Sequence, residues 1–231
     1  MMQPSIVAIR PEPGLSQTIE RAREAGLTVA GYPLFEVKPV NWSVPDDLAF
    51  DALLIGSANA IRHGGTQLAL LLDIPVYAVG ETTARTARNA GFDIAGVGSG
   101  GLQSLVDSLS HKAIKFLRLS GRDHVELTPP RSHSIVDRVL YESCTLSASD
   151  AFRAMVGEGG IVMLHSAVAA EHFNNECNRM AMNKADIRIA AFGPRVAEAA
   201  GDGWAGVAVA EQPNDVALLA LAKNMCQNLQ K

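Results

Sequence analysis

The chain has 231 residues, of which 48% are hydrophobic and 19% charged, and a formal charge of -4 at pH 7. This length and composition predict a globular protein of one large or two small domains, and the negative charge argues against non-specific binding to nucleic acid. No apolar run approaches the ~20 residues that span a bilayer, and the first residues lack the basic and apolar segments of a secretion signal. We therefore expect a cytoplasmic protein with no nucleic-acid or membrane partner.

Short apolar runs alternate with helical patterns along most of the chain. Strands are expected at 6–9, 28–31, 50–55, 76–79, 93–97, 114–119, 161–164, 189–192 and 207–210. Helical patterns follow most of them, whereas Pro129 and Pro130 leave room for at most a short helix after residue 123. The stretches 32–40 and 136–146 are typical of edge or linker strands. This order predicts parallel sheets with helices on both faces.

One strand–helix unit occurs twice, at 74–91 and 187–203. In each copy a glycine, Gly80 or Gly193, ends the apolar run, and a helical pattern follows. We expect Thr82 or Thr83 to cap the first of these helices and Pro194 to begin the second. Turns of this kind point backbone N–H groups outward at the positive end of a helix dipole, which favours anions. The repeat therefore predicts two similar halves that face one acidic ligand.

The segment Gly96–Gly101 matches the dinucleotide pattern GxGxxG, and Asp123 follows it at a suitable distance. That pattern normally opens its domain, however, and two strand–helix units precede it here. A flexible helix cap is therefore the favoured interpretation, with a nicotinamide-dependent oxidoreductase as an alternative. His165, His172 and Cys177 lie on or near one helix without the spacing of a zinc site, so we expect no metal.

Several polar side chains stand at predicted strand ends, where ligands gather in open α/β sheets. Ser57 and Ser166 occupy matching turns, and ligand binding and plain helix capping are equally open for both. Arg10 and Arg122 each come just after a strand. Tyr141 lies on the presumed linker strand, where it serves either packing or proton donation at a cleft.

Taken in order, a set of short motifs resembles the uroporphyrinogen-III synthase family. The motifs are Arg10-Pro11, Pro33-Leu34-Phe35-Glu36, the run 51–60 (DALLIGSANA), the run 78–87 (AVGETTARTA) with Gly91-Phe92, the run 119–123, Val139-Leu140-Tyr141-Glu142, and Ala191-Phe192-Gly193-Pro194. Each motif is loose, but together they cover nearly the whole chain in the order of the family.

The resemblance implies two similar flavodoxin-like α/β domains with parallel sheets, joined by a two-stranded β-ladder. The domains would be 1–35 with 147–231, and 41–138, and the linker strands would be 36–40 and 139–146. The resemblance also implies a cofactor-free, monomeric lyase of heme and porphyrin biosynthesis. Such an enzyme converts linear hydroxymethylbilane, a small-molecule substrate, to uroporphyrinogen III with loss of water and inversion of ring D. A non-catalytic two-domain binding module for an acidic metabolite is the other alternative.

By match to the family motifs, Tyr141 would donate a proton to the departing hydroxyl. The acetate and propionate arms of the substrate would bind at turns of both halves, at Arg10, Ser57, Ala58, Gly80, Thr82, Thr83, Arg122, Ser166, Gly193 and Arg195. Arg195-Val196 stands where family members often carry two threonines, so we expect a charged contact in place of a hydroxyl there.

Overall fold

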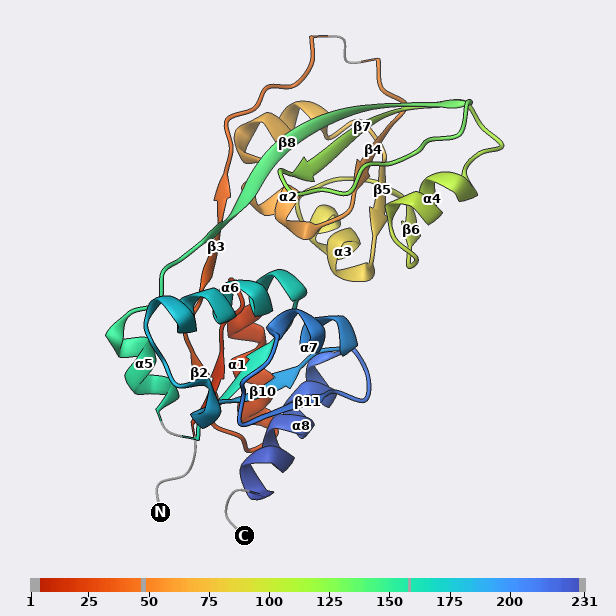
Figure 1. Cartoon of the computed structure of the whole chain (residues 1–231). Helices are drawn as coiled ribbons and strands as arrows, with labels where there is room; N and C mark the ends of the chain where they lie inside the picture. The colour runs from red at the N-terminus through yellow and green to blue at the C-terminus, as the bar shows by residue number, and fades with distance from the viewer. Residues whose placement is uncertain (1–4, 47–48, 158, 229–231) are drawn as a thin grey trace. The chain divides into compact units, whose positions relative to one another are not determined.

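The computed structural model describes residues 5–46, 49–157 and 159–228, which divide into two compact units. Unit 1 combines the chain up to Glu36 with the chain from Cys144 onward, and unit 2 is the segment Val37–Ser143 (Figure 1). Unit 2 is therefore an insertion in the sequence of unit 1. Both units contain a sheet covered by helices, as the alternating pattern of the sequence predicts.

Unit 1 is built on a five-stranded sheet with the order β11-β10-β9-β1-β2, in which neighbouring strands pair in parallel. Its strands are β1 (Ile6–Ala8), β2 (Ala30–Gly31), β9 (Ile161–Leu164), β10 (Arg188–Ala191) and β11 (Gly206–Val209). Its helices are α1 (Gly14–Glu24), α5 (Asp150–Val156), α6 (Ala167–Arg179), the 3-10 helix η2 (Lys184–Asp186), α7 (Pro194–Ala200) and α8 (Asp215–Asn228).

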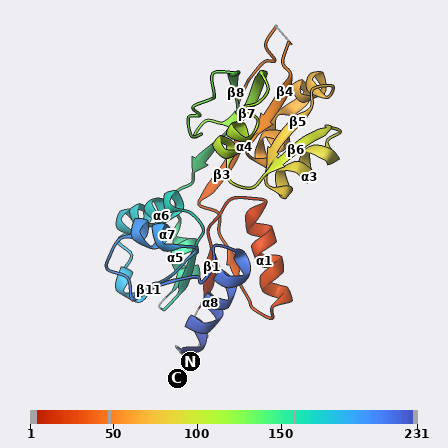
Figure 2. The same cartoon turned by 90° about the vertical axis from the view of Figure 1, so that its right-hand side faces the viewer.

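The central strands of unit 1 are buried on both faces, which explains their continuous apolar sequence. Val7 and Val162 face α5, α6 and α7, whereas Ile6 and Met163 face α1 and α8. Figure 2 shows these two groups of helices on opposite sides of the sheet. This leaves the strand ends, where loops meet, as the place for polar side chains.

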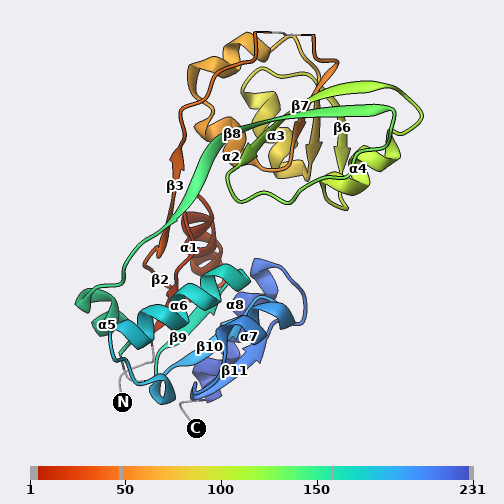
Figure 3. The same cartoon turned by 45° about the horizontal axis from the view of Figure 1, so that its top comes forward.

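Unit 2 is built on a six-stranded sheet with the order β3-β8-β7-β4-β5-β6. The strands are β3 (Phe35–Pro39), β4 (Ala52–Ile55), β5 (Val76–Val79), β6 (Ile94–Gly98), β7 (Ile114–Gly121) and β8 (His133–Thr145). The helices are α2 (Ala58–His63), the 3-10 helix η1 (Gly65–Leu71), α3 (Glu81–Asn89) and α4 (Leu102–Ser108). Residues of α2, η1 and α3 pack on one face, and Leu105 and Val106 of α4 pack on the other (Figure 3).

The two copies of the repeated unit occupy equivalent places in the two sheets. The first copy forms β5 and α3, the second forms β10 and α7. β5 lies between β4 and β6, and β10 lies between β9 and β11. The strand next to β4 is β7, and the strand next to β9 is β1. The predicted pair of similar parallel-sheet halves is thus confirmed.

Strands β3 and β8 are hydrogen-bonded neighbours, as expected for the two linker segments. The amide of Val40 donates to the carbonyl of Leu140 at 2.8 Å, and the amide of Leu146 donates to the carbonyl of Leu34 at 2.8 Å. β8 begins at His133, earlier than its sequence pattern indicates, because the strand also pairs in parallel with β7.

Other local predictions differ from the structure. Gly80 is the N-cap of α3 with no side-chain hydrogen bond, so the expected capping by Thr82 or Thr83 is wrong. Gly80 has φ +78°, a conformation that favours glycine. The helix α5 was not predicted, and no helix forms at 122–132. Among the described residues, no helix combines the length and hydrophobicity needed to cross a membrane.

Candidate functional site

A cavity of about 570 Å³ lies at the carboxyl ends of β4, β5 and β7 in unit 2. This is the edge where open α/β sheets bind ligands. Its lining comes from the ends of these strands, the turn before α4 with the first two residues of that helix, the loop after β7, and Tyr141 of β8. The residues are Gly56, Ser57, Val79, Gly100, Gly101, Leu102, Gln103, Arg118, Leu119, Ser120, Gly121, Asp123, His124, Val125, Glu126, Leu127 and Tyr141.

The position of Tyr141 is set by the pairing of β8 with β7. Arg118 pairs with Asp137, and Ser120 pairs with Val139. The register then shifts by one residue, so that Tyr141 pairs with Gly121. Such irregularities re-aim side chains and are frequent near active sites. A methyl group on Gly121 would lie 2.6 Å from Cε2 and 3.0 Å from the phenol oxygen of Tyr141. The aromatic ring thus occupies the space that the missing side chain leaves.

Arg118 is the buried cation of this cavity, with 3% of the residue exposed. Its Nη2 donates to the carbonyl of Val125 at 2.8 Å, which holds the loop after β7 against the strand. Its Nε lies 3.4 Å from Oδ1 of Asp137 but has no hydrogen-bond partner among the described residues. Burial lowers the pKa of this guanidinium, while Asp137 and Tyr141 act in the opposite direction.

The loop after β7 adds further polar groups. Nδ1 of His124 lies 2.8 Å from the carbonyl oxygen of Gly121, and its Nε2 lies 3.9 Å from Asp137. Asp123 and Glu126 line the cavity from exposed positions. Arg122 points elsewhere, since its Nε donates to Glu142 at 2.6 Å and it is absent from the lining.

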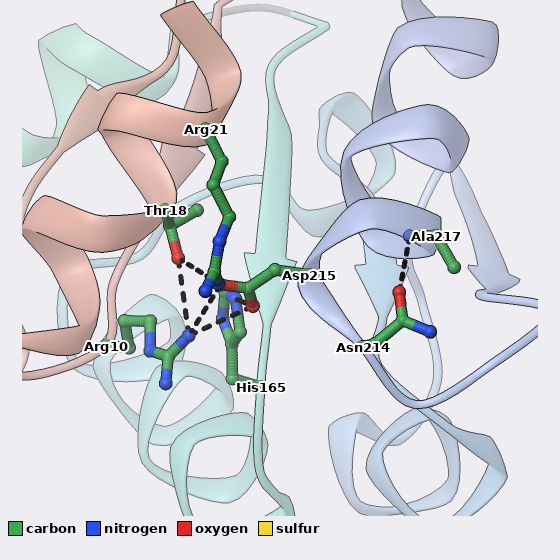
Figure 4. Close-up of polar contacts among 7 residues, drawn as sticks. All are labelled: Arg10, Thr18, Arg21, His165, Asn214, Asp215 and Ala217. Carbon is green, nitrogen blue, oxygen red and sulfur yellow. Dashed lines mark hydrogen bonds and ion pairs between the residues drawn. The ribbon is translucent and has the colours of Figure 1, made fainter. Parts of the chain in front are cut away.

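Unit 1 has a cluster of charged side chains at the corresponding sheet edge (Figure 4). The carboxylate of Asp215, in the first turn of α8, accepts hydrogen bonds from Arg10 (3.0 Å), Arg21 (2.6 Å) and Thr18 (3.2 Å). Nε2 of His165, which follows β9, lies 3.3 Å from the same carboxylate, outside hydrogen-bond geometry. In unit 2 the strand ends and helix start that correspond to these elements border the cavity.

The cluster shifts the acidities of two of its members. Burial alone would raise the pKa of Asp215, but His165, Arg10 and Thr18 outweigh it, so the pKa of this carboxyl is held well below its usual range. Burial lowers the pKa of His165, and Arg10 adds to this effect while Asp215 opposes it. Asp215 is therefore ionised and His165 neutral near pH 7.

The predicted site residues fall into both units. Of the residues predicted in unit 2, Ser57 and Tyr141 line the cavity. Ala58 is buried in the first turn of α2, Gly80 and the exposed Thr82 begin α3, and Thr83 is 5% exposed. In unit 1, Arg10 is paired with Asp215, Ser166 caps α6, and Gly193 and the exposed Arg195 stand at the start of α7.

The two serines both cap helices. The oxygen of Ser57 accepts from the amide of Asn59 at 3.2 Å, and that of Ser166 accepts from the amide of Ala169 at 3.2 Å. Capping uses a lone pair, so each hydroxyl hydrogen is still able to donate to a ligand. The structure thus shows that both serines cap helices, and each hydroxyl keeps its donor for a ligand.

The glycine motif does not form a dinucleotide-binding turn. Gly96 and Gly98 lie within β6, and a methyl group on Gly96 would lie 2.9 Å from the ring of Tyr77. Only Gly100 and Gly101 belong to the turn before α4, where they border the cavity. The glycine at 96 thus makes room for an aromatic ring and not for a pyrophosphate.

Sequence reasoning missed three notable residues. Arg118 interrupts an otherwise apolar buried strand, IKFLRLSG, and that interruption was a usable signal. The role of Gly121 depends on the register of β8, which is not readable from local sequence. The contacts of Asp215 with residues near the N-terminus have no local signature.

The comparisons with known proteins found one family model and several similar solved structures. A family model described as uroporphyrinogen-III synthase HemD matches residues 16–220. The solved uroporphyrinogen-III synthetase of Helicobacter pylori 26695 is similar over 96% of this chain and 99% of its own, with a TM-score of 0.66 and 18% identity. A mutant uroporphyrinogen III synthase of the extremely thermophilic bacterium Thermus thermophilus is similar over 97% and 99%, with a TM-score of 0.51 and 17% identity. No curated protein matches the sequence significantly.

Proposed function

The chain belongs to the uroporphyrinogen-III synthase family, and we propose that the cavity of unit 2, with Tyr141 in its lining, is where its reaction begins. Members of this family are lyases of heme biosynthesis. The chain accordingly converts linear hydroxymethylbilane to uroporphyrinogen III, with loss of water and inversion of ring D. The observation that supports the proposed site is that the proton donor expected from the family motif lines a cavity at the ligand-binding edge of a parallel sheet.

The protein has to supply few chemical groups for this reaction. A pyrrole expels the hydroxyl with the lone pair of its own nitrogen, so neither a nucleophile nor a metal is required. A weak acid must protonate the departing oxygen, and the chain must be held folded until the inverted ring has formed. Spontaneous closure yields the uninverted isomer. We assign the acid role to the phenol of Tyr141, since a phenol O–H is a hydrogen-bond donor.

The cavity has a size suited to one end of the substrate. Its volume of about 570 Å³ falls within the ~300–1,000 Å³ of small-molecule sites, whereas a linear tetrapyrrole with eight carboxylates is larger. We therefore place the hydroxyl-bearing ring in the cavity. For the acidic arms we propose the binding residues expected from the family motifs, which are Arg10, Ser57, Ala58, Gly80, Thr82, Thr83, Arg122, Ser166, Gly193 and Arg195.

Arg10 has a geometry suited to holding an acidic arm. Asp215 engages its Nη1, and 29% of the side chain is exposed. Two arginines share this one carboxylate, so the cluster of Arg10, Arg21 and Asp215 carries a net positive charge. A carboxylate arm of the substrate would be attracted to it.

We further propose that the chain works as a cytoplasmic monomer with domains 1–35 plus 147–231 and 41–138. The boundaries are drawn from the family motifs, and the compact units lie close to them. Sedimentation of the purified protein measures the oligomeric state, and limited proteolysis measures the boundaries. Cleavage inside a sheet, in preference to the linker regions, would contradict the domain assignment.

The test of the proposed function is an isomer assay with freshly made hydroxymethylbilane. The wild type should give the type III product. Tyr141→Phe, which keeps the ring and removes the proton, should slow turnover markedly while the unfolding midpoint stays unchanged. A matched control is Tyr77→Phe, because Tyr77 lies outside the cavity lining. Full activity of Tyr141→Phe would mean that solvent or substrate supplies the proton.

A further inference from the structure

The guanidinium of Arg10 has one side occupied and one side open. Its Nη1 donates to both carboxylate oxygens of Asp215, at 3.0 and 3.3 Å, and to the hydroxyl oxygen of Thr18 at 3.3 Å. Its Nε and Nη2 make no hydrogen bond to the residues that the structure describes, and both are open to solvent. In arginine the N–H groups of Nε and Nη2 form a planar fork that fits the two oxygens of a carboxylate. Arg10 therefore keeps a donor pair for a carboxylate from outside the chain.

Gly14, the first residue of α1, lies directly against this open side. A methyl group on Gly14 would lie 2.5 Å from Nε, 2.7 Å from Cζ and 2.7 Å from Nη2 of Arg10. These distances are far below the ~3.5 Å at which non-bonded atoms settle. The backbone of Gly14 has no positive φ, so its conformation does not call for glycine. The close approach of the guanidinium is what requires the missing side chain.

Asp215 fixes the other side of the guanidinium (Figure 4). Its carboxylate is 6% exposed and also accepts hydrogen bonds from Arg21 at 2.6 Å and from Thr18 at 3.2 Å. These bonds hold the carboxylate in place, so that Nη1 of Arg10 has a fixed anchor. Two arginines share this one negative charge, so the charge of Arg10 is only partly neutralised.

The acidic residue closest to Arg10 in sequence does not occupy the open side. Glu12 accepts hydrogen bonds from the amide of Ser16 at 3.1 Å and from its hydroxyl at 2.8 Å. Within the described part of the chain, Asp215 is the one carboxylate that pairs with Arg10. The fork of Nε and Nη2 is therefore left without a partner in a chain whose expected substrate carries eight carboxylates.

We propose that Gly14 is a positioning residue, which keeps the Nε–Nη2 side of the anchored Arg10 open for a carboxylate arm of the substrate; this rests on the proposed function. A long side chain loses rotamer freedom when it binds a ligand. Arg10 loses that freedom during folding, because Asp215 holds one side of its guanidinium and α1 supports it at Gly14. Binding of the arm then costs less free energy, although Gly14 itself does not touch the substrate.

The effect should appear in KM and not in kcat. Arg10 belongs to unit 1, whereas the proposed acid, Tyr141, lines the cavity of unit 2. An arm that does not react is held equally in the ground state and in the transition state. Loss of such an interaction raises KM and leaves kcat unchanged. A hydrogen bond between charged groups corresponds to a factor of about ten in affinity.

The experiment measures kcat and KM for type III product from freshly made hydroxymethylbilane. Arg10→Met should raise KM about tenfold, and Gly14→Ala about fivefold, since the displaced guanidinium keeps its charge. Gly14→Ala added to Arg10→Met should cause no further rise, because Gly14 acts only through Arg10. Added salt should raise the KM of the wild type more than that of Arg10→Met.

A matched control is Gly31→Ala, in the same unit. Its methyl group would lie 2.8 Å from Cδ1 of Ile19, an overlap similar to that at Gly14 but with an apolar side chain. This variant should keep the wild-type KM. The urea midpoint of Gly14→Ala should stay close to that of the wild type, because alanine favours a helix over glycine and thus offsets the displacement. A purely structural role of Gly14 would instead move the midpoint and leave KM unchanged.

A raised KM in Gly14→Ala that disappears in the Arg10→Met background would support the inference. If Arg10→Met does not fold, the KM of Gly14→Ala against that of Gly31→Ala decides. An unchanged KM in Gly14→Ala, or a further rise in the double variant, would overturn the inference while the wild type still forms the type III isomer. A wild type that forms no type III isomer would refute the proposed function, and the inference with it.

Discussion

Replacing Gly121 with alanine tests whether the position of the Tyr141 ring controls the reaction. The added methyl group would stand 2.6 Å from Cε2, 2.7 Å from Cζ and 3.0 Å from the phenol oxygen. Non-bonded carbon atoms prefer a separation of about 3.5–4.0 Å, so the ring must move by about 1 Å. The backbone of Gly121 has no positive φ, and alanine therefore causes no backbone strain.

The cost to stability should be small and the cost to activity large. The group in the way is the free end of a side chain, so the free energy of unfolding should fall by no more than about 1 kcal/mol, the lower end of overpacking costs. A misplacement of about 1 Å in a reacting group is able to reduce turnover about 100-fold. The expected variant is therefore folded and nearly inactive.

The assay combines urea unfolding with the rate of type III formation. Gly96→Ala is a matched control, because its methyl group would lie 2.9 Å from the ring of Tyr77, which does not line the cavity. This control should share the small loss of stability and keep its activity. In a chain that already carries Tyr141→Phe, Gly121→Ala should cause little further loss. Full activity of Gly121→Ala, or equal losses in both alanine variants, would refute the reasoning.

Three further predictions concern unit 1. The fold lowers the pKa of His165, so the stability that its neutral form contributes is present above the unfolded-state pKa of about 6.5 and is lost as the pH falls. In His165→Gln the urea midpoint should therefore fall less steeply between pH 7 and pH 5 than in the wild type. An equal slope in both proteins would contradict this. Asp215→Asn should lower the free energy of unfolding by roughly 2 kcal/mol, because two arginines lose their shared carboxylate; a change below measurement error in urea unfolding would argue against the cluster. Burial raises the pKa of Cys177 to about 12, so iodoacetamide at pH 8 should modify the partly exposed Cys144 first in mass spectra, whereas early labelling of Cys177 would show that it is not protected.

Several strands and helices were predictable because their signals are local. Val76–Val79 and Ile161–Leu164 are continuous apolar runs bounded by polar or turn residues, and the structure has strands with these limits. The capping of α2 by Ser57 and the start of α7 at Pro194 likewise follow from neighbouring residues. Signals from neighbouring residues therefore predicted most of the strands and helices.

What sequence did not show depends on pairing between distant segments. The early start of β8 at His133 follows from its register with Ile114, and the place of Tyr141 follows from a slip in the same pairing. The contact of Arg10 with Asp215 joins residues 205 positions apart. Sequence thus identified Tyr141 by family motif, whereas the glycine that makes room for its ring became visible only in the sheet.

The insertion of unit 2 into unit 1 has a consequence for how the chain acquires its structure during synthesis. Ile6 of β1 pairs with Ile161 of β9, and at ~5–20 residues per second the ribosome needs roughly 8 to 30 s to supply that partner. Unit 2 is one continuous segment, so it can fold before the residues that follow it have been synthesised. Once it has folded, the paired β3 and β8 shorten the loop between β1 and β9 from about 150 to about 40 flexible residues, which lowers the entropy cost of closure by about 1 kcal/mol. Prior folding of unit 2 therefore makes the pairing of β1 with β9 in unit 1 less costly.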